Sequence, residues 1–308
     1  MKIYLSSWSL RESISRGSPK LEDLPALASR HGFSGVELMD RQLENSSPYL
    51  EDLKRRCQKI GCGVILDIDS DLTYSDDKKW WEQIVHVRDM IDVARLLGAE
   101  KVRICLGGQS MSFEKLFKSF GFVNPKTTHR HSVYQPAIEL MQRLAMNQYV
   151  VRLAKNYRKS GKGRVKNEES KIKRAVEALK KILPKAEEHK ITLGIENHWG
   201  ISSLPENILE ILNELDSPYI GTCIDLENFP KTLDRYECIK KLALKVVHVH
   251  AKSLNFDKNG EEKDIDYKKC LQILKDQHYD DTITVEYEGG GDAIEGSLRT
   301  RELIMKYW

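Results

Sequence analysis

Several features that mark other classes of protein are missing from this chain of 308 residues. It contains no apolar run of about 18 residues, so we expect no transmembrane helix. Its opening segment MKIYLSSWSL lacks the basic start and the apolar stretch of a secretory signal. The six cysteines form no Cys-x-x-Cys pair, which predicts buried, reduced thiols in a cytoplasmic protein. Nine prolines and nineteen glycines also exclude a collagen-like or largely disordered chain.

Two phosphate-binding fingerprints and a strong charge of one sign are absent as well. The end of the first expected strand reads LSSWSL, without the Gly-x-Gly-x-x-Gly turn that binds dinucleotides, and no P-loop occurs. The 49 basic and 46 acidic residues leave a formal charge of +3, which excludes a strongly basic nucleic-acid binder on average. What remains is the composition of an ordinary globular protein, 40% hydrophobic and 31% charged.

The sequence does contain short β-branched runs that alternate with longer amphipathic stretches. The expected strands are Lys2–Ser6, Gly35–Leu38, Gly63–Ile68, Lys101–Leu106, Thr192–Asn197, Ile220–Asp225, Val246–Lys252 and Thr282–Glu288. The expected helices are 20–31, 49–60, 80–97, 168–189, 205–215, 232–243, 266–277 and 293–307. Ser203 and Glu206 form a candidate capping box, and Gly32, Gly61 and Gly98 stand where helices should end.

Eight strand–helix units predict an α/β fold, a (β/α)8 TIM barrel in one domain spanning 1–308. A doubly wound open sheet is the alternative, and the missing dinucleotide fingerprint weakens it.

Residues 108–169 interrupt this alternation after the fourth strand. Without these 62 residues the chain has the roughly 250 residues of a plain barrel, so we interpret them as an insertion in the fourth βα loop. Apolar residues at helical spacing between 138 and 149 predict that the insertion is partly helical. Active sites of TIM barrels lie on the face formed by these loops, which places the insertion beside the expected site.

Alternate residues of a barrel strand point inward, and this parity gathers ionisable side chains at one end of the barrel. Glu196, Asp225, His250 and Glu286 stand on the inward parity near the ends of four consecutive strands. Burying three carboxylates together is costly unless a cation neutralises them. An imidazole with carboxylate oxygens suits Mn²⁺, Co²⁺ or Mg²⁺, which we expect in preference to Zn²⁺.

The segments around these residues resemble a known superfamily. LGIENHWG, TCIDLENF, VVHVHAKS and TVEYEGG, together with GVELMD at 35–40, are similar to the sugar-phosphate isomerase/epimerase superfamily of xylose isomerase-like barrels. The resemblance covers the chain except for 108–169. In the ketose 3-epimerase branch it implies a metal held by Glu196, Asp225, His250 and Glu286. It also implies that Glu196 and Glu286 serve as base and acid on opposite faces of a small carbohydrate.

The resemblance implies a sugar or sugar-phosphate isomerase or epimerase that abstracts an α-proton and passes through an enediolate. An aldose–ketose isomerase would need only one of the two glutamates. Two alternatives stay open: a metal-dependent sugar or inosose dehydratase, and the barrel subunit of a hetero-oligomeric lyase that cleaves C-glycosides. The superfamily's zinc endonucleases are disfavoured, because VILDID in the third strand lacks a histidine and Asn228 stands where they carry another.

Seven further residues are candidates for binding substrate, each with a structural alternative. His198 and Lys252 lie two residues beyond Glu196 and His250, so they share the inward side, although Lys252 could instead pair with a neighbouring glutamate. His248 lies one layer deeper, where an orienting hydrogen bond is the alternative. The remaining candidates are Glu37 (or a partner for a cation), Trp8 (or rim packing), Asn228 (or a loop cap) and Glu288.

The insertion 108–169 is basic, with twelve Lys and Arg against four Asp and Glu. It could steer an anionic substrate, form a subunit interface or be a solvated surface. We therefore expect a homo-oligomer, with a small partner chain docked on 108–169 as the alternative. Nucleic acid and membrane are not expected partners.

Overall fold

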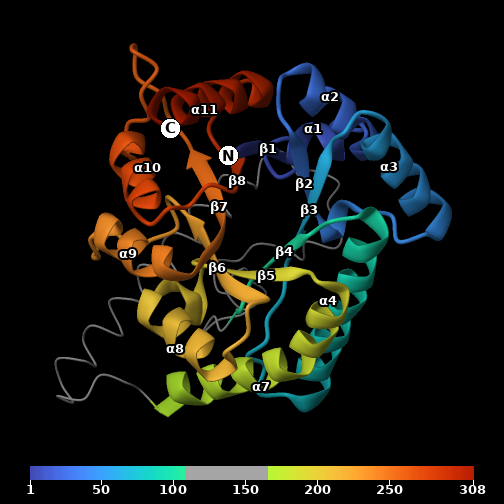
Figure 1. Cartoon of the computed structure of the whole chain (residues 1–308), viewed down its shortest axis with the longest axis vertical. Helices are drawn as coiled ribbons and strands as arrows, with labels where there is room; N and C mark the ends of the chain where they lie inside the picture. Colours follow the sequence, from blue (N-terminus) through green and yellow to red (C-terminus); the bar gives the residue numbers. More distant parts are fainter. Residues whose placement is uncertain (108–165) are drawn as a thin grey trace, which may run out of the picture.

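Within the described residues, 1–107 and 166–308 of a computed structural model, eight parallel strands close into a barrel (Figure 1). Each strand pairs with the next in the sequence, and β8 pairs back with β1. The strands are β1 (Lys2–Ser6), β2 (Gly35–Met39), β3 (Gly63–Ile68), β4 (Lys101–Ile104), β5 (Thr192–Glu196), β6 (Ile220–Asp225), β7 (Val246–Ser253) and β8 (Thr282–Tyr287). The predicted TIM barrel is confirmed, although β4 ends two residues earlier than expected.

Helices surround the barrel (Figure 1). They are α1 (Arg11–Ser15), α2 (Leu24–Arg30), α3 (Ser47–Lys59), α4 (Asp77–Leu97), α7 (Lys166–His189), α8 (Pro205–Leu215), α9 (Arg235–Leu242), α10 (Tyr267–Asp276) and α11 (Ala293–Tyr307). Helix α7 begins at Lys166 and so takes in the last residues assigned to the insertion. The rest of that segment, including its expected helix, lies outside the described residues. Among the described helices, none combines the length and apolar character needed to cross a membrane.

Local sequence signals explain several helix ends, but one predicted signal fails. The Asp76 carboxylate accepts a hydrogen bond from the Lys79 amide at the start of α4, and Gly98 ends that helix with φ of 77°. The predicted capping box at Ser203 is wrong. Its hydroxyl donates to the Gly200 carbonyl at 2.7 Å inside a short 3-10 turn, and α8 begins after Leu204 instead.

The two faces of the strands are packed differently. Ile195, Ile224 and Val249 are fully buried on the side that packs against the helices. On the inner side, the Tyr4 ring lies so close to Gly35 and Gly63 that a Cβ there would fall 2.5 and 1.8 Å from its atoms. Glycine is therefore required at both positions, because it leaves room for the Tyr4 ring inside the barrel at the amino-terminal ends of β2 and β3.

The pairing of β6 with β7 contains a bulge at Val247. Thr222 pairs with Val246, but Cys223 pairs with His248, so β7 carries one extra residue at this point. Strict alternation along β7 would place Val247 on the helix side together with Val249. Instead, its methyl groups lie 2.5 Å from a Cβ built on Gly221 and 3.6 Å from one built on Gly194. Val247 thus shares the inner side with His248, in the space that the two glycines leave.

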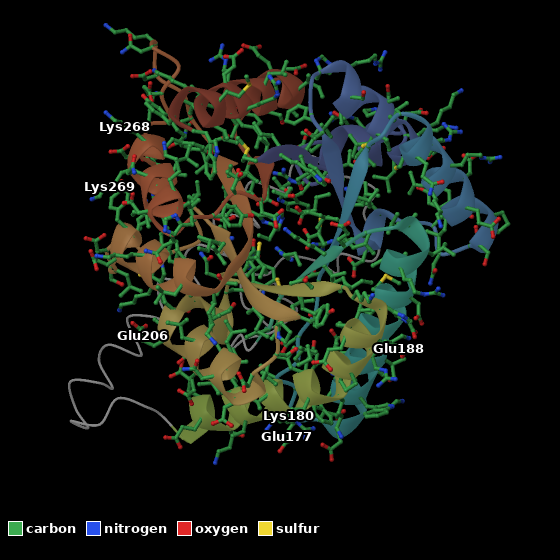
Figure 2. All side chains as sticks on the ribbon, in the orientation of Figure 1. Glu177, Lys180, Glu188, Glu206, Lys268 and Lys269 are labelled. Carbon is green, nitrogen blue, oxygen red and sulfur yellow. The ribbon has the colours of Figure 1, made fainter. Side chains whose placement is uncertain are left out.

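Charged side chains cover the outside of the helical ring. The labelled residues in Figure 2 point away from the barrel: Glu177, Lys180 and Glu188 on α7, Glu206 on α8, and Lys268 and Lys269 on α10. Charge in these positions is solvated and needs no further explanation. Ionisable groups inside the barrel do need one, because burial of unpaired charge is costly.

Candidate metal centre

Four ionisable side chains meet at the carboxyl ends of β5 to β8. Each of Glu196, Asp225, His250 and Glu286 offers one ligand atom within 4.8 Å of the others, and all four residues are buried. The sheet register explains the convergence, because Asp225 pairs with His250 and Lys252 pairs with Glu286 in neighbouring strands. The structure therefore brings together the four residues that strand parity selected, in a cluster suited to a divalent cation.

His250 lies between two carboxylates that fix the orientation of its ring. Its Nε2 lies 2.8 Å from Glu37 Oε1, and its Nδ1 lies 2.9 Å from Glu196 Oε1 and 4.0 Å from Glu286 Oε2. A metal-binding histidine commonly donates its other ring nitrogen to a carboxylate. This arrangement fits that pattern, with Glu37 holding Nε2 and Nδ1 directed at the cluster.

Glu37 is fully buried and serves two imidazoles. Its second oxygen, Oε2, lies 2.8 Å from His248 Nε2. Burial raises the pKa of Glu37, but the charges of His250 and His248 outweigh this effect and hold the pKa well below its usual range. We predicted Glu37 and His248 as substrate-binding candidates. In the structure, Glu37 and His248 bind each other beneath the cluster. This agrees with the structural alternatives given for them, a partner for a cation in the case of Glu37 and an orienting hydrogen bond in the case of His248.

Arg103 of β4 connects the cluster to β3, and the sequence analysis missed it. Its Nη1 lies 2.6 Å from Asp67 Oδ1 and its Nη2 lies 2.6 Å from Glu196 Oε2, with all three residues buried. Burial raises the pKa of Glu196, but the charge of Arg103 and the hydrogen bond with His250 lower it well below its usual range. The missed signal was a charged residue on the inward parity near the end of each strand, Asp67 in β3 and Arg103 in β4.

Lys252 lies among carboxylates. Its Nζ is 3.2 Å from Asp225 Oδ2, 3.1 Å from Glu286 Oε2 and 3.2 Å from Glu288 Oε1. It also donates to Asn228 Oδ1 at 3.2 Å. The expected ion pair with a neighbouring glutamate is present, and Lys252 additionally contacts two members of the cluster. Both Lys252 and Asn228 therefore stand beside the cluster.

Asp225 is held by its backbone neighbours while one oxygen faces the cluster. Its Oδ1 accepts hydrogen bonds from the amides of Glu227 and Asn228 at 2.7 and 2.8 Å. Its Oδ2 is buried and has the Lys252 ammonium 3.2 Å away, but it accepts no well-aligned hydrogen bond from any described residue. Burial raises the pKa of Asp225 to about 7, against the opposing charge of Lys252. A buried oxygen in this position fits a metal ligand, because a cation would compensate its burial.

Asn197 joins the ends of β5 and β6. Its side-chain Nδ2 donates to the Asp225 carbonyl at 3.0 Å, and its Oδ1 accepts from the Asp225 amide at 2.8 Å. This reciprocal pair fixes the position of Asp225 relative to Glu196, the residue that precedes Asn197. Sequence reasoning did not select Asn197, since its parity places it on the opposite side of the strand.

His198, Trp8 and Glu288 lie at the rim of the cluster. His198 Nε2 is 3.8 Å from Glu196 Oε2, and burial lowers the pKa of His198 to about 3, so the ring is neutral. Trp8 Nε1 donates to Glu288 Oε1 at 2.6 Å, and the guanidinium of Arg11 lies 4.5 Å above the Trp8 ring. All three candidates thus lie where a molecule bound over the cluster would meet them.

Residues 111–306 match the model of the xylose isomerase-like TIM barrel family. The chain belongs to this family.

Two curated relatives are similar over part of the chain. One is the uncharacterized protein MJ1311 of Methanocaldococcus jannaschii, 28% identical in an alignment of 144 positions that covers 42% of this chain and 46% of that protein. The other is the 3-oxo-isoapionate decarboxylase of Pectobacterium atrosepticum, 26% identical over 135 residues, 44% of this chain and 46% of that protein. The chain thus spans about half the length of the curated relatives it matches.

Solved structures share the fold over the whole chain. A D-tagatose 3-epimerase-like protein has a TM-score of 0.67 and 19% identity, covering 100% of this chain and 97% of its own. An L-ribulose 3-epimerase has a TM-score of 0.69 and 15% identity, covering 99% and 93%. The IolI protein with a bound zinc atom has a TM-score of 0.67 and 17% identity, covering 100% and 99%.

Proposed function

We propose that the protein is a divalent-metal-dependent sugar isomerase or epimerase. The observation that carries this proposal is the convergence of Glu196, Asp225, His250 and Glu286 within 4.8 Å inside the barrel. The solved structures that share the fold include an L-ribulose 3-epimerase and a D-psicose 3-epimerase, which supports a carbohydrate as substrate.

The four clustered residues would hold the metal through three carboxylates and His250 Nδ1. When bound, the cation supplies Lewis acidity toward the carbonyl and the neighbouring hydroxyl of a sugar, which acidifies the α-proton. Cys223 also lies near His250, but burial raises the pKa of its thiol to about 12. A protonated thiol is a poor ligand, so oxygen ligands dominate and favour Mn²⁺, Co²⁺ or Mg²⁺.

Glu196 and Glu286 would move the protons. They come from β5 and β8, which are separated by two strands, so they can approach a bound sugar from different sides. Arg103 keeps Glu196 ionised, as a base must be, and the Lys252 ammonium, 3.1 Å from Glu286, would stabilise the charge of that carboxylate once it has given up its proton. One glutamate suffices for an aldose–ketose isomerase, whereas an epimerase uses both.

Rim residues would bind the sugar. A neutral imidazole can both donate and accept a hydrogen bond, so His198 suits a hydroxyl group. Trp8 stands at the rim with its indole nitrogen held by Glu288, and the guanidiniums of Arg11 and Arg41 lie 4.5 and 5.3 Å from the centre of its ring. These contacts would orient a polyol without requiring charge on it.

A second candidate function is the decarboxylation of a 3-oxo sugar acid. It is favoured by the partial similarity to the 3-oxo-isoapionate decarboxylase. Loss of carbon dioxide from a 3-oxo acid leaves the same type of enolate that proton abstraction produces, so the same electrostatic stabilisation serves both reactions. Dehydration of a sugar or inosose also begins with that proton abstraction.

Solvent exchange distinguishes these reactions. The protein loaded with Mn²⁺ is incubated in D₂O with a panel of ketoses, and proton NMR follows the α-carbon hydrogen. We expect deuterium incorporation together with an isomeric product, reduced by about 10²–10⁴-fold in Glu196→Gln and Glu286→Gln. Glu188→Gln on the outside of α7 is the matched control (Figure 2). Release of carbon dioxide from a 3-oxo acid without exchange in any ketose would favour decarboxylation. Neither activity, or mutants equal to wild type, would overturn the proposal.

A further inference from the structure

The end of helix α3 brings two cysteines together. The Cys62 amide donates to the Cys57 carbonyl at 3.0 Å, and the Gly61 amide donates to the Gln58 carbonyl at 3.2 Å. Gly61 has φ of 64°, in the left-handed region. These two bonds and the left-handed glycine define the Schellman ending of a helix.

In a Schellman ending, the two residues joined by the hydrogen bond that spans five positions, here 57 and 62, usually form an apolar contact through their side chains. Here both positions are cysteine. The backbone hydrogen bond holds Cys57 and Cys62 beside each other at this ending, and the Cys62 thiol donates a hydrogen bond to the Gly63 carbonyl at 3.6 Å. The helix ending thus carries two thiols at the positions where other Schellman endings carry two apolar side chains.

The two thiols differ in their access to solvent. Cys57 is 2% exposed within the core, whereas Cys62 is only partly buried and packs against that core. The remaining four cysteines of the chain are all buried. A small oxidant can therefore reach Cys62 from solvent, and Cys57 lies at the other end of the backbone hydrogen bond that Cys62 donates.

We propose that Cys57 and Cys62 form a reversible dithiol–disulfide site whose oxidant is a peroxide. The peroxide oxidises the Cys62 sulfur to a sulfenic acid and leaves as water. The Cys57 sulfur then attacks the Cys62 sulfur, forming the S–S bond and releasing the oxygen as a second water. The two thiols lose two hydrogens and two electrons in all, and the peroxide gains them.

The site lies outside the barrel and does not depend on the proposed sugar chemistry. Its disulfide would tie the end of α3 to the start of β3, because Cys62 directly precedes Gly63. The backbone bond between the same two residues keeps their main chains adjacent, so closure requires little backbone movement.

Peptide mapping of the whole protein tests the proposal. Protein is treated with hydrogen peroxide, its free thiols are blocked with N-ethylmaleimide, and it is cleaved with trypsin. Cleavage after Arg56, Lys59 and Lys78 places Cys57 in peptide 57–59 and Cys62 in peptide 60–78. We expect these two peptides joined, lighter by two hydrogens than their sum, and separated again by dithiothreitol.

Two variants make the result specific. Cys62→Ser should abolish the joined peptide, and it lies at a partly exposed position that tolerates the change. Cys238→Ala, at a buried cysteine on another helix, should retain it. The proposal is overturned if the wild type carries maleimide on both peptides after oxidation, or if Cys62 accumulates as sulfinic acid without the link.

Discussion

Arg103 Nη2 lies 2.6 Å from Glu196 Oε2, and both residues are buried inside the barrel. The opposite side of the same carboxylate faces His250 Nδ1. Glu196 therefore has one oxygen held by a permanent cation and the other directed at the candidate metal site. Removing the arginine would free the carboxylate to rotate and leave Asp67 without its buried partner.

Replacing Arg103 should weaken metal binding. In Arg103→Met we expect the Kd for Mn²⁺ to rise by about 10–100-fold, because partners that orient metal ligands typically contribute that much. The Kd of Arg103→Lys should lie between those of the wild type and Arg103→Met, since lysine keeps the charge but not the forked geometry of the guanidinium. Isothermal titration calorimetry measures this, with Arg301→Met on α11 as a control. A Kd equal to wild type in both Arg103 variants would contradict the assignment.

Replacing Glu37 should disturb two histidines at once. Glu37→Ala leaves the Nε2 atoms of His248 and His250 without their buried carboxylate, and we expect a loss of about 3–5 kcal/mol in the free energy of unfolding. The exposed Glu51→Ala should change it by less than about 0.5 kcal/mol. Urea denaturation measures both. Equal midpoints for the two variants would show that Glu37 does not hold the histidines.

Asn197 should contribute to stability through its two contacts with Asp225. Asn197→Ala removes both and leaves buried backbone groups unpaired, which we expect to cost about 1–3 kcal/mol. Asn197→Asp keeps the acceptor but loses the donor and adds charge beside Asp225, so it should destabilise more at neutral pH. If the aspartate variant matches wild type in urea, the donor contact is unimportant.

Glu288 should make stability depend on pH. Burial raises its pKa, but Lys252, Arg11 and the Trp8 hydrogen bond lower it from 4.5 to about 2. A carboxyl whose pKa is depressed by folding stabilises the protein above its unfolded pKa and loses that contribution as pH falls through the folded value. Glu288→Gln should cost about 2–3 kcal/mol at pH 7. The difference from wild type should hold to about pH 5 and narrow below about 4.5. A difference that stays constant down to pH 3 would count against this view.

Strand parity carried much of the sequence prediction. Glu196, Asp225, His250 and Glu286 could be selected because the alternation of side chains is a local property with a period of two. Each stands in its own strand beside apolar neighbours that reveal the outer face. The barrel order then brings the four strand ends together without further information.

Contacts between strands were beyond that reasoning. Asp67 and Arg103 are partners only because β3 and β4 align at those residues, and register is a non-local property. The prediction of a helix cap at Ser203 was also wrong because of a partner that the sequence does not reveal: its hydroxyl binds the Gly200 carbonyl instead of capping α8. In both cases the sequence shows a side chain able to form the bond, but it does not show which group that side chain binds.

Because of the bulge at Val247, the inward–outward alternation of side chains along β7 is interrupted and starts again. Before the bulge, Val246 pairs with Thr222 and follows the same inward–outward alternation. After the bulge, the alternation starts again at His248, so that His248, His250 and Lys252 all point inward. The extra residue acts as a spacer, so losing Val247 would restore an even ladder and still direct His250 inward. Losing Val249 instead would leave His248 facing inward but turn His250 and Lys252 toward the helices, and Ala251 would occupy the inward side of the strand. The strand can thus tolerate a change of length at one position and not two residues further on.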